Sequence, residues 1–272
     1  MNQPLELLVD GAACGDGWPQ DRALMYGDGL FETMLVRGGH IRFEERHMAR
    51  LAEGCQRLAI TADLPQVWSQ ARLAARRHGE ATLRLQLTRG AALARGYTPT
   101  GAESARVILA VYAAPAAGEL PARVKAVSLS MTLGENPVLA GLKHCNRLEQ
   151  VLARLALRES SDAFEGLMAS SSGVLVSGTM SNVFLELDGE LVTPSVDLCG
   201  VAGVMREVVL HTAAQGGRAL RIAALPFDVL GRCRALALSN ARMGLVPVHE
   251  LDGRALAADS PLHALAAQVA AQ

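Results

Sequence analysis

The chain has 272 residues, and half of them are hydrophobic, so it can bury a substantial core in one large domain or in two domains of ordinary size. Its 26 basic and 27 acidic residues leave a formal net charge of -1, which excludes a net field that attracts nucleic acid or an anionic membrane. Any anion must therefore be recognised locally, and this favours a small-molecule pocket.

The first residues lack the basic start and long apolar stretch of a signal peptide, and no segment offers about eighteen uninterrupted apolar residues. We therefore expect a cytoplasmic protein. The cysteines form an odd count without a CxxC pair, which indicates reduced thiols that mostly fill the core. They are Cys14, Cys55, Cys145, Cys199 and Cys233.

The first part of the chain alternates strand and helix patterns. The strand over residues 30–36 turns through Gly38 and Gly39, which supply the positive φ angles of a tight hairpin, into residues 41–43. Further strands are predicted over residues 5–11, 81–90 and 105–115, and helices over residues 43–58 and 67–79.

A segment with two prolines, residues 113–123, is the candidate linker. We therefore predict a small N-terminal α/β domain over residues 1–115, a linker over 116–123 and a larger C-terminal domain over 124–272 that is richer in sheet. In the second part, helices are predicted to begin near Asn146 and Gly203. Strands are predicted over residues 124–133, 166–170, 173–178, 182–189 and 190–194.

Lys143 follows an apolar Leu-Ala-Gly-Leu run and precedes a helix that we expect to start at residue 146 or 147. Asn146 and Glu149 fit an N-cap with a capping-box partner. The partial positive charge of a helix start and an apolar surround both disfavour the ammonium form, so that the amine could form a Schiff base. An ordinary loop lysine whose charged end reaches solvent is the alternative, and the pattern by itself favours that alternative.

A resemblance to a known family favours the Schiff-base interpretation of Lys143 over the ordinary loop lysine. It rests on six segments in chain order: YGDGLFETMLVRGG, RHMARL, TRGAALARGY, GLKHCNRLEQVLAR, SNVFLE and GVAGVMRE. They resemble the class IV (fold-type IV) pyridoxal-phosphate enzymes, which include branched-chain and D-amino-acid aminotransferases and 4-amino-4-deoxychorismate lyase. GLKHCNRLEQVLAR resembles the lyase of p-aminobenzoate synthesis. The resemblance implies a mixed α/β, two-domain homodimer with pyridoxal 5'-phosphate at the domain interface.

By this resemblance, Lys143 holds the cofactor covalently and Arg50, in RHMARL, grips its phosphate. A planar fork of donors suits a phosphate dianion, although Arg50 by itself fits better as one of several solvated helix arginines. The other implied cofactor residues are Ser177, Asn182, Gly203, Val204, Met205, Ser239, Asn240 and Ala241.

Gly203 opens a predicted helix, where unpaired N–H groups can bind an anion closely because glycine has no side chain. Met205 stands where many relatives have threonine, so only backbone amides could serve there. Glycine is also common at a helix start for capping alone, and residues 239–241 also fit an ordinary polar turn.

For the substrate, the resemblance implies that the loop with Arg95 and Tyr97 reaches toward the substrate carboxylate of the neighbouring subunit. A surface-loop arginine is an equally good interpretation of Arg95. Phe31 takes a position where some aminotransferases carry tyrosine, so an aromatic wall remains without its hydroxyl.

Ser177 is a departure from the family pattern, which has a glutamate that pairs with the protonated pyridine nitrogen of the cofactor. A hydroxyl cannot neutralise a cation, so the cofactor should withdraw electrons less strongly. We expect this to favour elimination over transamination. A degenerate, poorly active site is the opposite interpretation.

The resemblance thus implies a lyase that converts 4-amino-4-deoxychorismate to p-aminobenzoate and pyruvate in folate biosynthesis, with Lys143 moving the proton. An aminotransferase of branched-chain or D-amino acids and a weakly active cofactor-binding protein stay open as alternatives. We expect no metal site, because the seven histidines are far apart and no HExxH occurs.

Overall fold

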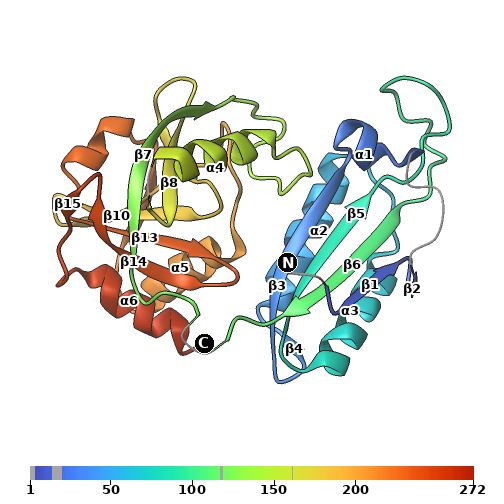
Figure 1. Ribbon diagram of the computed structural model, residues 1–272, viewed down its shortest axis with the longest axis horizontal. Helices are drawn as coiled ribbons and strands as arrows, with labels where there is room; N and C mark the ends of the chain where they lie inside the picture. Colours follow the sequence, from blue (N-terminus) through green and yellow to red (C-terminus); the bar gives the residue numbers. More distant parts are fainter. Residues whose placement is uncertain (1–3, 14–19, 117–118, 161) are drawn as a thin grey trace. The chain divides into compact units, whose positions relative to one another are not determined.

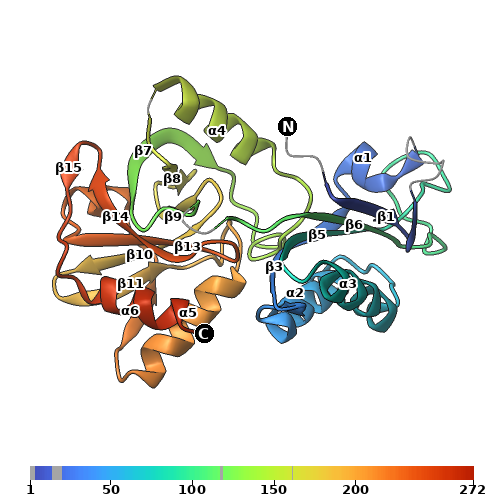
Figure 2. The same ribbon diagram turned by 60° about the horizontal axis from the view of Figure 1, so that its bottom comes forward.

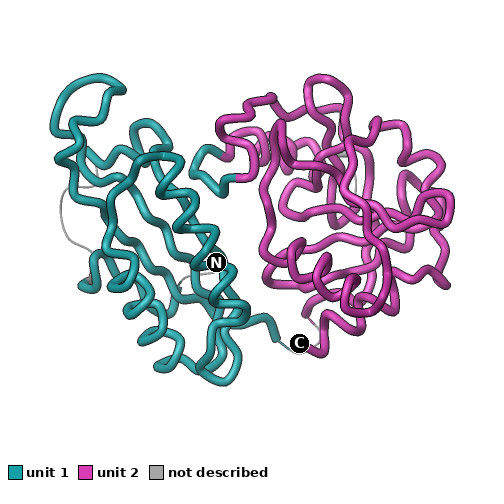
Figure 3. The backbone as a smooth tube through the Cα atoms, turned by 180° about the vertical axis from the view of Figure 1, so that it is seen from behind, with its two compact units in different colours: residues 1–117, 142–146 teal, residues 118–141, 147–272 magenta. Residues whose placement is uncertain are grey.

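The computed structural model describes residues 4–13, 20–116, 119–160 and 162–272 (Figure 1). Their contacts divide the chain into two compact units: residues 1–117 with 142–146 form unit 1, and residues 118–141 with 147–272 form unit 2 (Figure 3). Each unit combines helices with a sheet, as the sequence predicts, and unit 2 has more strands.

Unit 1 contains, within the described residues, a six-stranded sheet in the order β2-β1-β6-β5-β3-β4, with antiparallel neighbours throughout. The hairpin between β3 and β4 turns through Gly38 and Gly39 at φ 55° and 78°, as predicted from the Gly-Gly pair. The strands are β1 (Glu6–Val9), β2 (Ala12–Ala13), β3 (Gly29–Arg37), β4 (His40–Ile41), β5 (Ala81–Thr88) and β6 (Arg106–Ala113).

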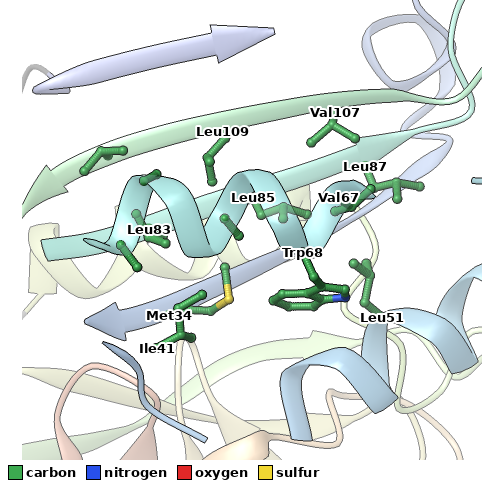
Figure 4. Packing of buried hydrophobic residues seen from close by; sticks show 14 of the residues in the cluster. Met34, Ile41, Leu51, Val67, Trp68, Leu83, Leu85, Leu87, Val107 and Leu109 are labelled. Atoms are coloured by element: carbon green, nitrogen blue, oxygen red, sulfur yellow. The ribbon is translucent and has the colours of Figure 1, made fainter. Parts of the chain in front are cut away.

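Two amphipathic helices, α2 (Glu44–Arg57) and α3 (Leu64–His78), cover one face of this sheet (Figure 2). The core beneath them is apolar and includes the fully buried Trp68 and Leu51 (Figure 4). α3 starts before the predicted residue 67, because the Asp63 side chain accepts a hydrogen bond from the Gln66 N–H and caps the helix. The short α1 (Arg22–Tyr26) was not predicted.

Unit 2 contains a nine-stranded mixed sheet, counted over the described residues. Its order is β12-β11-β10-β13-β14-β7-β8-β9, and β15 pairs with β14. The strands are β7 (Val124–Leu133), β8 (Glu165–Ser170), β9 (Leu175–Gly178), β10 (Asn182–Leu187), β11 (Glu190–Pro194), β12 (Leu220–Ala223), β13 (Ala235–Asn240), β14 (Gly244–Leu251) and β15 (Arg254–Ala255).

The helices of unit 2 are α4 (Leu148–Ser160), α5 (Val204–Gln215) and α6 (Pro261–Ala270), with a 3-10 turn at Phe227–Gly231. α4 packs on β7 and β8, whereas α5 and α6 pack against each other and against β13 and β14. The start of α5 agrees with the prediction at Gly203. The sequence analysis did not predict α6, which Ser260 caps through the Leu262 N–H.

Residues 142–146 belong to unit 1 by their contacts, whereas we expected them within the C-terminal domain. They run along β3: the Phe31 N–H donates to the Lys143 carbonyl (2.9 Å), and the Cys145 N–H donates to the Gly29 carbonyl (2.9 Å). Leu30 and His144 form an isolated bridge in the same stretch. The backbone around Lys143 is therefore held by the edge of β3, and the predicted domain boundaries stay a prediction.

The start of α4 differs from the expectation. The helix begins at Leu148, and the expected capping pair has other partners: the Asn146 amide donates to the Gly27 carbonyl (3.3 Å), and Glu149 accepts from the Gly134 N–H (2.8 Å). The predicted capping box was therefore wrong, because both side chains are used in contacts with distant parts of the chain.

The cysteines that the structure describes form no disulfide, and Cys55, Cys199 and Cys233 are buried. Burial raises the pKa of the Cys55 thiol to about 11. Cys14 lies outside the described residues. Across the described ranges, no helix combines the length and apolar character that crossing a membrane requires.

Candidate functional site

Lys143 and Arg84 both lie against the ring of Phe31. The Lys143 Nζ is 4.3 Å from the ring centre, and the guanidinium carbon of Arg84 is 4.5 Å from it. Arg84 comes from β5, which pairs with β3, and it has no acidic partner among the residues that the structure describes. An amine and an uncompensated cation thus meet at one buried aromatic ring.

The composition singles out Lys143 more sharply than its local pattern does. The whole sequence contains two lysines, Lys125 and Lys143. Lys125 lies 3.4 Å from a Glu250 oxygen and 4.0 Å from an Asp162 oxygen, which makes it a partly exposed ion-pair lysine. Lys143 is therefore the candidate for covalent chemistry, and this count was a signal that the sequence analysis did not use.

Arg50 projects from α2 onto a buried glutamate that the sequence analysis missed. Its Nε donates to one oxygen of Glu32 (2.8 Å), and its Nη2 donates to the other. His47, also on α2, lies with Nδ1 2.6 Å from Glu32. The signal in the sequence is a single charged residue inside the mostly apolar strand LFETMLV.

Glu32 is ionised despite its burial. Removal from water raises the pKa of this carboxyl, but the charge of Arg50 and the hydrogen bonds from His47 and Arg50 outweigh that effect and lower the pKa to about 2. The Glu32 carboxylate binds the edge of the Arg50 guanidinium that carries Nε and Nη2, and this contact fixes the orientation of the guanidinium. A fixed guanidinium of this kind suits recognition of a phosphate, which is the role that the resemblance implies for Arg50.

Within unit 2, Asn182, Gly203 and Ser239 come together at the start of α5. The Asn182 amide donates to the Val201 carbonyl (2.9 Å), and a Cβ on Gly203 would lie 2.0 Å from the Asn182 Oδ1. Asn182 and Ser239 face each other across β10 and β13. Ser239 is buried, and its Oγ has no hydrogen-bond partner within the described residues.

This arrangement fits an anion. Gly203 is the N-cap of α5 and provides no side-chain cap, so the first amides of the helix keep their capacity to donate. The unpaired Ser239 hydroxyl is a further donor nearby. Val204 and Met205 bury their side chains in the core, so they could serve only through their backbone amides, as expected for Met205.

Asn240 and Ala241 lie in a turn whose polar groups are largely occupied. The Asn240 Oδ1 accepts from the N–H groups of Arg242 and Met243 (3.0 Å each), and its Nδ2 donates to the Met180 carbonyl (3.4 Å). Asn240 therefore shapes the turn, which is the alternative interpretation raised for residues 239–241.

Ser177 is a buried residue one position before the end of β9, and its hydroxyl donates to the Gly178 carbonyl (2.9 Å). The hydroxyl carries no charge, and its proton is engaged with the backbone. It can accept a hydrogen bond, but it cannot act as the counter-ion of a protonated ring nitrogen.

Arg95 and Tyr97 are exposed in the loop between β5 and β6. The Tyr97 carbonyl accepts from the Arg22 Nη2 (2.6 Å), and its ring packs edge-on against Tyr26 at 5.3 Å between ring centres. No hydrogen bond or ring contact joins Arg95 or Tyr97 to Lys143 in the described part of the chain. The loop is anchored to α1, and its contact with a substrate stays a prediction.

A family model described as amino-transferase class IV matches residues 29–251. The chain belongs to the class IV aminotransferase family. Its fold is the mixed α/β fold-type IV architecture. The crystal structure of 4-amino-4-deoxychorismate lyase from Pseudomonas aeruginosa is similar to it, with 39% identity, a TM-score of 0.91, and coverage of 98% of this chain and 99% of that one.

Two further relatives extend the comparison. Aminodeoxychorismate lyase of Vibrio harveyi is 30% identical over 246 residues, which cover 89% of this chain and 90% of that protein. A hypothetical aminotransferase from Mycobacterium tuberculosis, solved in a PLP-bound form, is 25% identical with a TM-score of 0.80, and the match covers 97% of each chain. Class IV aminotransferases use pyridoxal 5'-phosphate, and this chain is a fold-type IV pyridoxal-phosphate enzyme.

Proposed function

We propose that the chain is an aminodeoxychorismate lyase, which converts 4-amino-4-deoxychorismate to p-aminobenzoate and pyruvate in folate biosynthesis. The observation that carries the proposal is the contact of both Lys143 Nζ and the Arg84 guanidinium with the Phe31 ring, at 4.3 and 4.5 Å. The similarity to two lyases, at 39% and 30% identity, supports it.

The substrate carries two carboxylates and a ring that becomes aromatic, and the chain offers a matching group for one carboxylate and for the ring. Arg84 would bind a carboxylate, because its charge is not neutralised by an acidic neighbour among the described residues. The face of Phe31 suits the flat ring of the substrate and of its product.

Lys143 would serve as both attachment point and base. Pyridoxal phosphate, when bound through Lys143, supplies the electron withdrawal that acidifies the ring carbon bearing the substrate amine. Once the substrate amine has taken the place of Lys143 on the cofactor, the freed Lys143 amine takes the proton from that carbon. The bond from the neighbouring carbon to the enolpyruvyl oxygen then breaks, and the proton returns through Lys143 to the departing three-carbon unit, which leaves as pyruvate. The Lys143 amine finally displaces the amine of p-aminobenzoate from the cofactor, which releases the second product.

Within unit 2, the first amides of α5 at Gly203, Val204 and Met205 and the Ser239 hydroxyl would bind the cofactor phosphate. That Arg50 grips the same phosphate is what the resemblance implies. Asn182 would shape this anion site through its contacts with Val201 and Gly203. The helix start and the hydroxyl donor of unit 2 suit an anion.

The uncharged Ser177 favours the lyase over its nearest rival. Transamination depends on a strongly electron-withdrawing ring, which a carboxylate at this position would maintain. In the elimination, the electrons released from carbon leave directly with the neighbouring oxygen. Ser177 would therefore slow transamination more than elimination.

Mixing the purified protein with enzymatically generated 4-amino-4-deoxychorismate tests the proposal. Equal amounts of p-aminobenzoate and pyruvate are expected. A parallel assay with 2-oxoglutarate and branched-chain or D-amino acids tests the aminotransferase alternative, which the family name keeps open. Cofactor binding without product in either assay would leave a cofactor-binding protein and would overturn the lyase assignment.

We also propose that the chain forms a homodimer. α4 buries Ala153 and Leu157 against β7 and β8, yet it exposes an apolar stripe on its opposite side. This stripe consists of Leu148, Val151, Leu152 and Leu155, which are 70%, 51%, 46% and 40% exposed. A helix that is apolar on two opposite sides fits a second packing partner, and a second copy of the chain is the partner that the family resemblance implies.

A further inference from the structure

We propose that Glu165 is a positioning residue that sets the shape of the cofactor-phosphate site. This inference rests on the phosphate site in the proposed function, because it concerns the loop that carries Asn182. Glu165 touches no substrate or cofactor atom in this proposal. It acts through the loop over residues 179–181, which connects β9 to β10.

Glu165 lies at the start of β8 and is 0% exposed. Its Oε1 accepts from the N–H and the hydroxyl of Thr179, and its Oε2 accepts from the Met180 N–H (3.2 Å) and the Ser181 hydroxyl (2.8 Å). The Gly166 N–H adds a further hydrogen bond to Oε1 (3.0 Å). Both carboxylate oxygens are thus occupied, mostly by three consecutive residues of one loop.

The loop is closed tightly on this carboxylate. A Cβ on Gly178 would lie 2.4 Å from the Ser181 Oγ and 2.7 Å from Glu165 Cδ, so glycine alone fits without a shift. The Arg154 Nη1 lies 3.8 Å from the Glu165 Oε1, so the partly exposed Arg154 side chain supplies a nearby positive charge. A buried carboxylate that accepts several hydrogen bonds in this way fixes the backbone that donates them.

The fixed loop leads directly into the phosphate site. Asn182 follows Ser181, donates to the Val201 carbonyl and lies against the Gly203 backbone at the start of α5. The Asn240 amide also attaches to this loop, because it donates to the Met180 carbonyl (3.4 Å). Glu165 therefore fixes the loop to which the site residue Asn182 and the turn residue Asn240 are both attached.

The role of the carboxylate differs from general stabilisation in one measurable respect. If Glu165 positions the phosphate site, its loss should weaken binding of the phosphorylated cofactor and spare binding of pyridoxal, which lacks the phosphate. A merely structural role would affect both ligands through the fraction of folded protein. The ratio of the two dissociation constants therefore isolates the positioning role.

The test titrates the full chain, freed of its covalently held cofactor with hydroxylamine and then dialysed, with pyridoxal phosphate and with pyridoxal. In Glu165→Gln, an amide nitrogen replaces one acceptor and faces donors of the loop, so we expect the preference for pyridoxal phosphate to fall about tenfold. Thr179→Val removes one donor with little change of shape and should lower the preference about threefold. It also serves if Glu165→Gln does not fold.

Glu186→Gln is the matched control. Glu186 is likewise a buried glutamate of this sheet, but it pairs with Arg234 at the other end of β10, at 2.9 Å. This variant should keep the preference of the unaltered protein. An unchanged preference in Thr179→Val and in folded Glu165→Gln would overturn the inference, as would an unaltered protein that binds both ligands equally. A protein that prefers pyridoxal phosphate yet forms no p-aminobenzoate would overturn only the lyase assignment.

Discussion

At the scale of single residues, Lys143 makes the simplest prediction because the chain has one other lysine. Lys143→Ala should abolish turnover and the long-wavelength absorbance of the bound cofactor together, since both depend on the same amine. Borohydride reduction followed by peptide mass mapping should find the cofactor on Lys143. Lys125→Ala is the control and should keep both properties, because Lys125 is an ion-pair lysine at Glu250. A reduced adduct on Lys125 would contradict the assignment.

Arg84 is expected to act in substrate binding. Arg84→Gln keeps a polar side chain of similar length but loses the charge, so KM for 4-amino-4-deoxychorismate should rise about tenfold or more with a smaller change in kcat. Arg84→Lys should recover part of the affinity. Steady-state kinetics at varied substrate concentration measure the effect. The control is Arg221→Gln, which removes an exposed arginine paired with Glu190 and should leave KM unchanged.

Ser177 separates elimination from transamination. Ser177→Glu introduces the counter-ion that the ring nitrogen lacks, so we expect a gain in the rate of amino transfer to 2-oxoglutarate and a loss of lyase specificity. Ser177→Ala removes the hydroxyl without adding a charge and should show no such gain. A Ser177→Glu variant with unchanged rates in both assays would refute this role.

The resemblance singled out Lys143 and Arg50 because each lies in a distinctive local segment, and their roles stay predictions. Arg84, Glu32 and Glu165 escaped it, since their importance comes from partners on other elements. Arg84 reaches Phe31 because β5 pairs with β3. Glu165, on β8, contacts a loop that comes after the next strand, β9. Local pattern does not encode such partners.

At the scale of elements, the attachment of α2 to β3 depends on pH through Glu32. The pKa of this carboxyl is about 2 in the folded chain, below its ordinary value of 4.5. Its contribution to the free energy of unfolding is therefore fully present above pH 4.5 and is lost as the pH falls toward 2. The difference corresponds to about 3 kcal/mol at most.

Glu32→Gln should accordingly lower the free energy of unfolding at pH 7 by a few kcal/mol and should cost much less near pH 3, where the carboxylate has lost part of its advantage. Urea unfolding at both pH values measures this. Glu80→Gln is the matched control, because Glu80 pairs with Arg37 at the surface and should change stability little at either pH. An equal loss for Glu32→Gln at pH 7 and pH 3 would contradict the charge argument.

Most strands and the longer helices could be predicted because their apolar periodicity spans enough residues to be recognised. α1 has five residues, which is too short for a helical period, and α6 is an alanine-rich segment with a weak pattern. The predicted capping box of α4 failed for a different reason. Asn146 and Glu149 have the right spacing, but their side chains form hydrogen bonds with the backbones of Gly27 and Gly134 instead.

At the scale of the whole molecule, the resemblance predicted the fold-type IV architecture, and the match over residues 29–251 confirms it. Hydrophobic patterning alone indicated two mixed α/β domains but assigned residues 142–146 by chain order. Their contacts follow β3 instead, because backbone hydrogen bonds form wherever an unpaired strand edge is available. Such long-range pairing is not visible in the sequence.

The exposed stripe of α4 leads to the last prediction, which concerns assembly. Each apolar side chain that becomes buried between two copies contributes roughly 1–3 kcal/mol, so four of them per subunit form a substantial part of an interface. Leu152→Glu would place a charge in the centre of the stripe and should convert the dimer to a monomer at micromolar concentration. Light scattering after size-exclusion chromatography measures the mass.

The control for this experiment is Ile222→Glu. Ile222 is an apolar residue on β12 that is 51% exposed, similar to Leu152, and it lies outside the α4 stripe. Because both variants add one charge at an exposed apolar position, general effects on solubility should be equal. A dimer in Ile222→Glu and a folded monomer in Leu152→Glu would assign the contact to α4, whereas two dimers, or a monomeric unaltered chain, would exclude this helix as the interface.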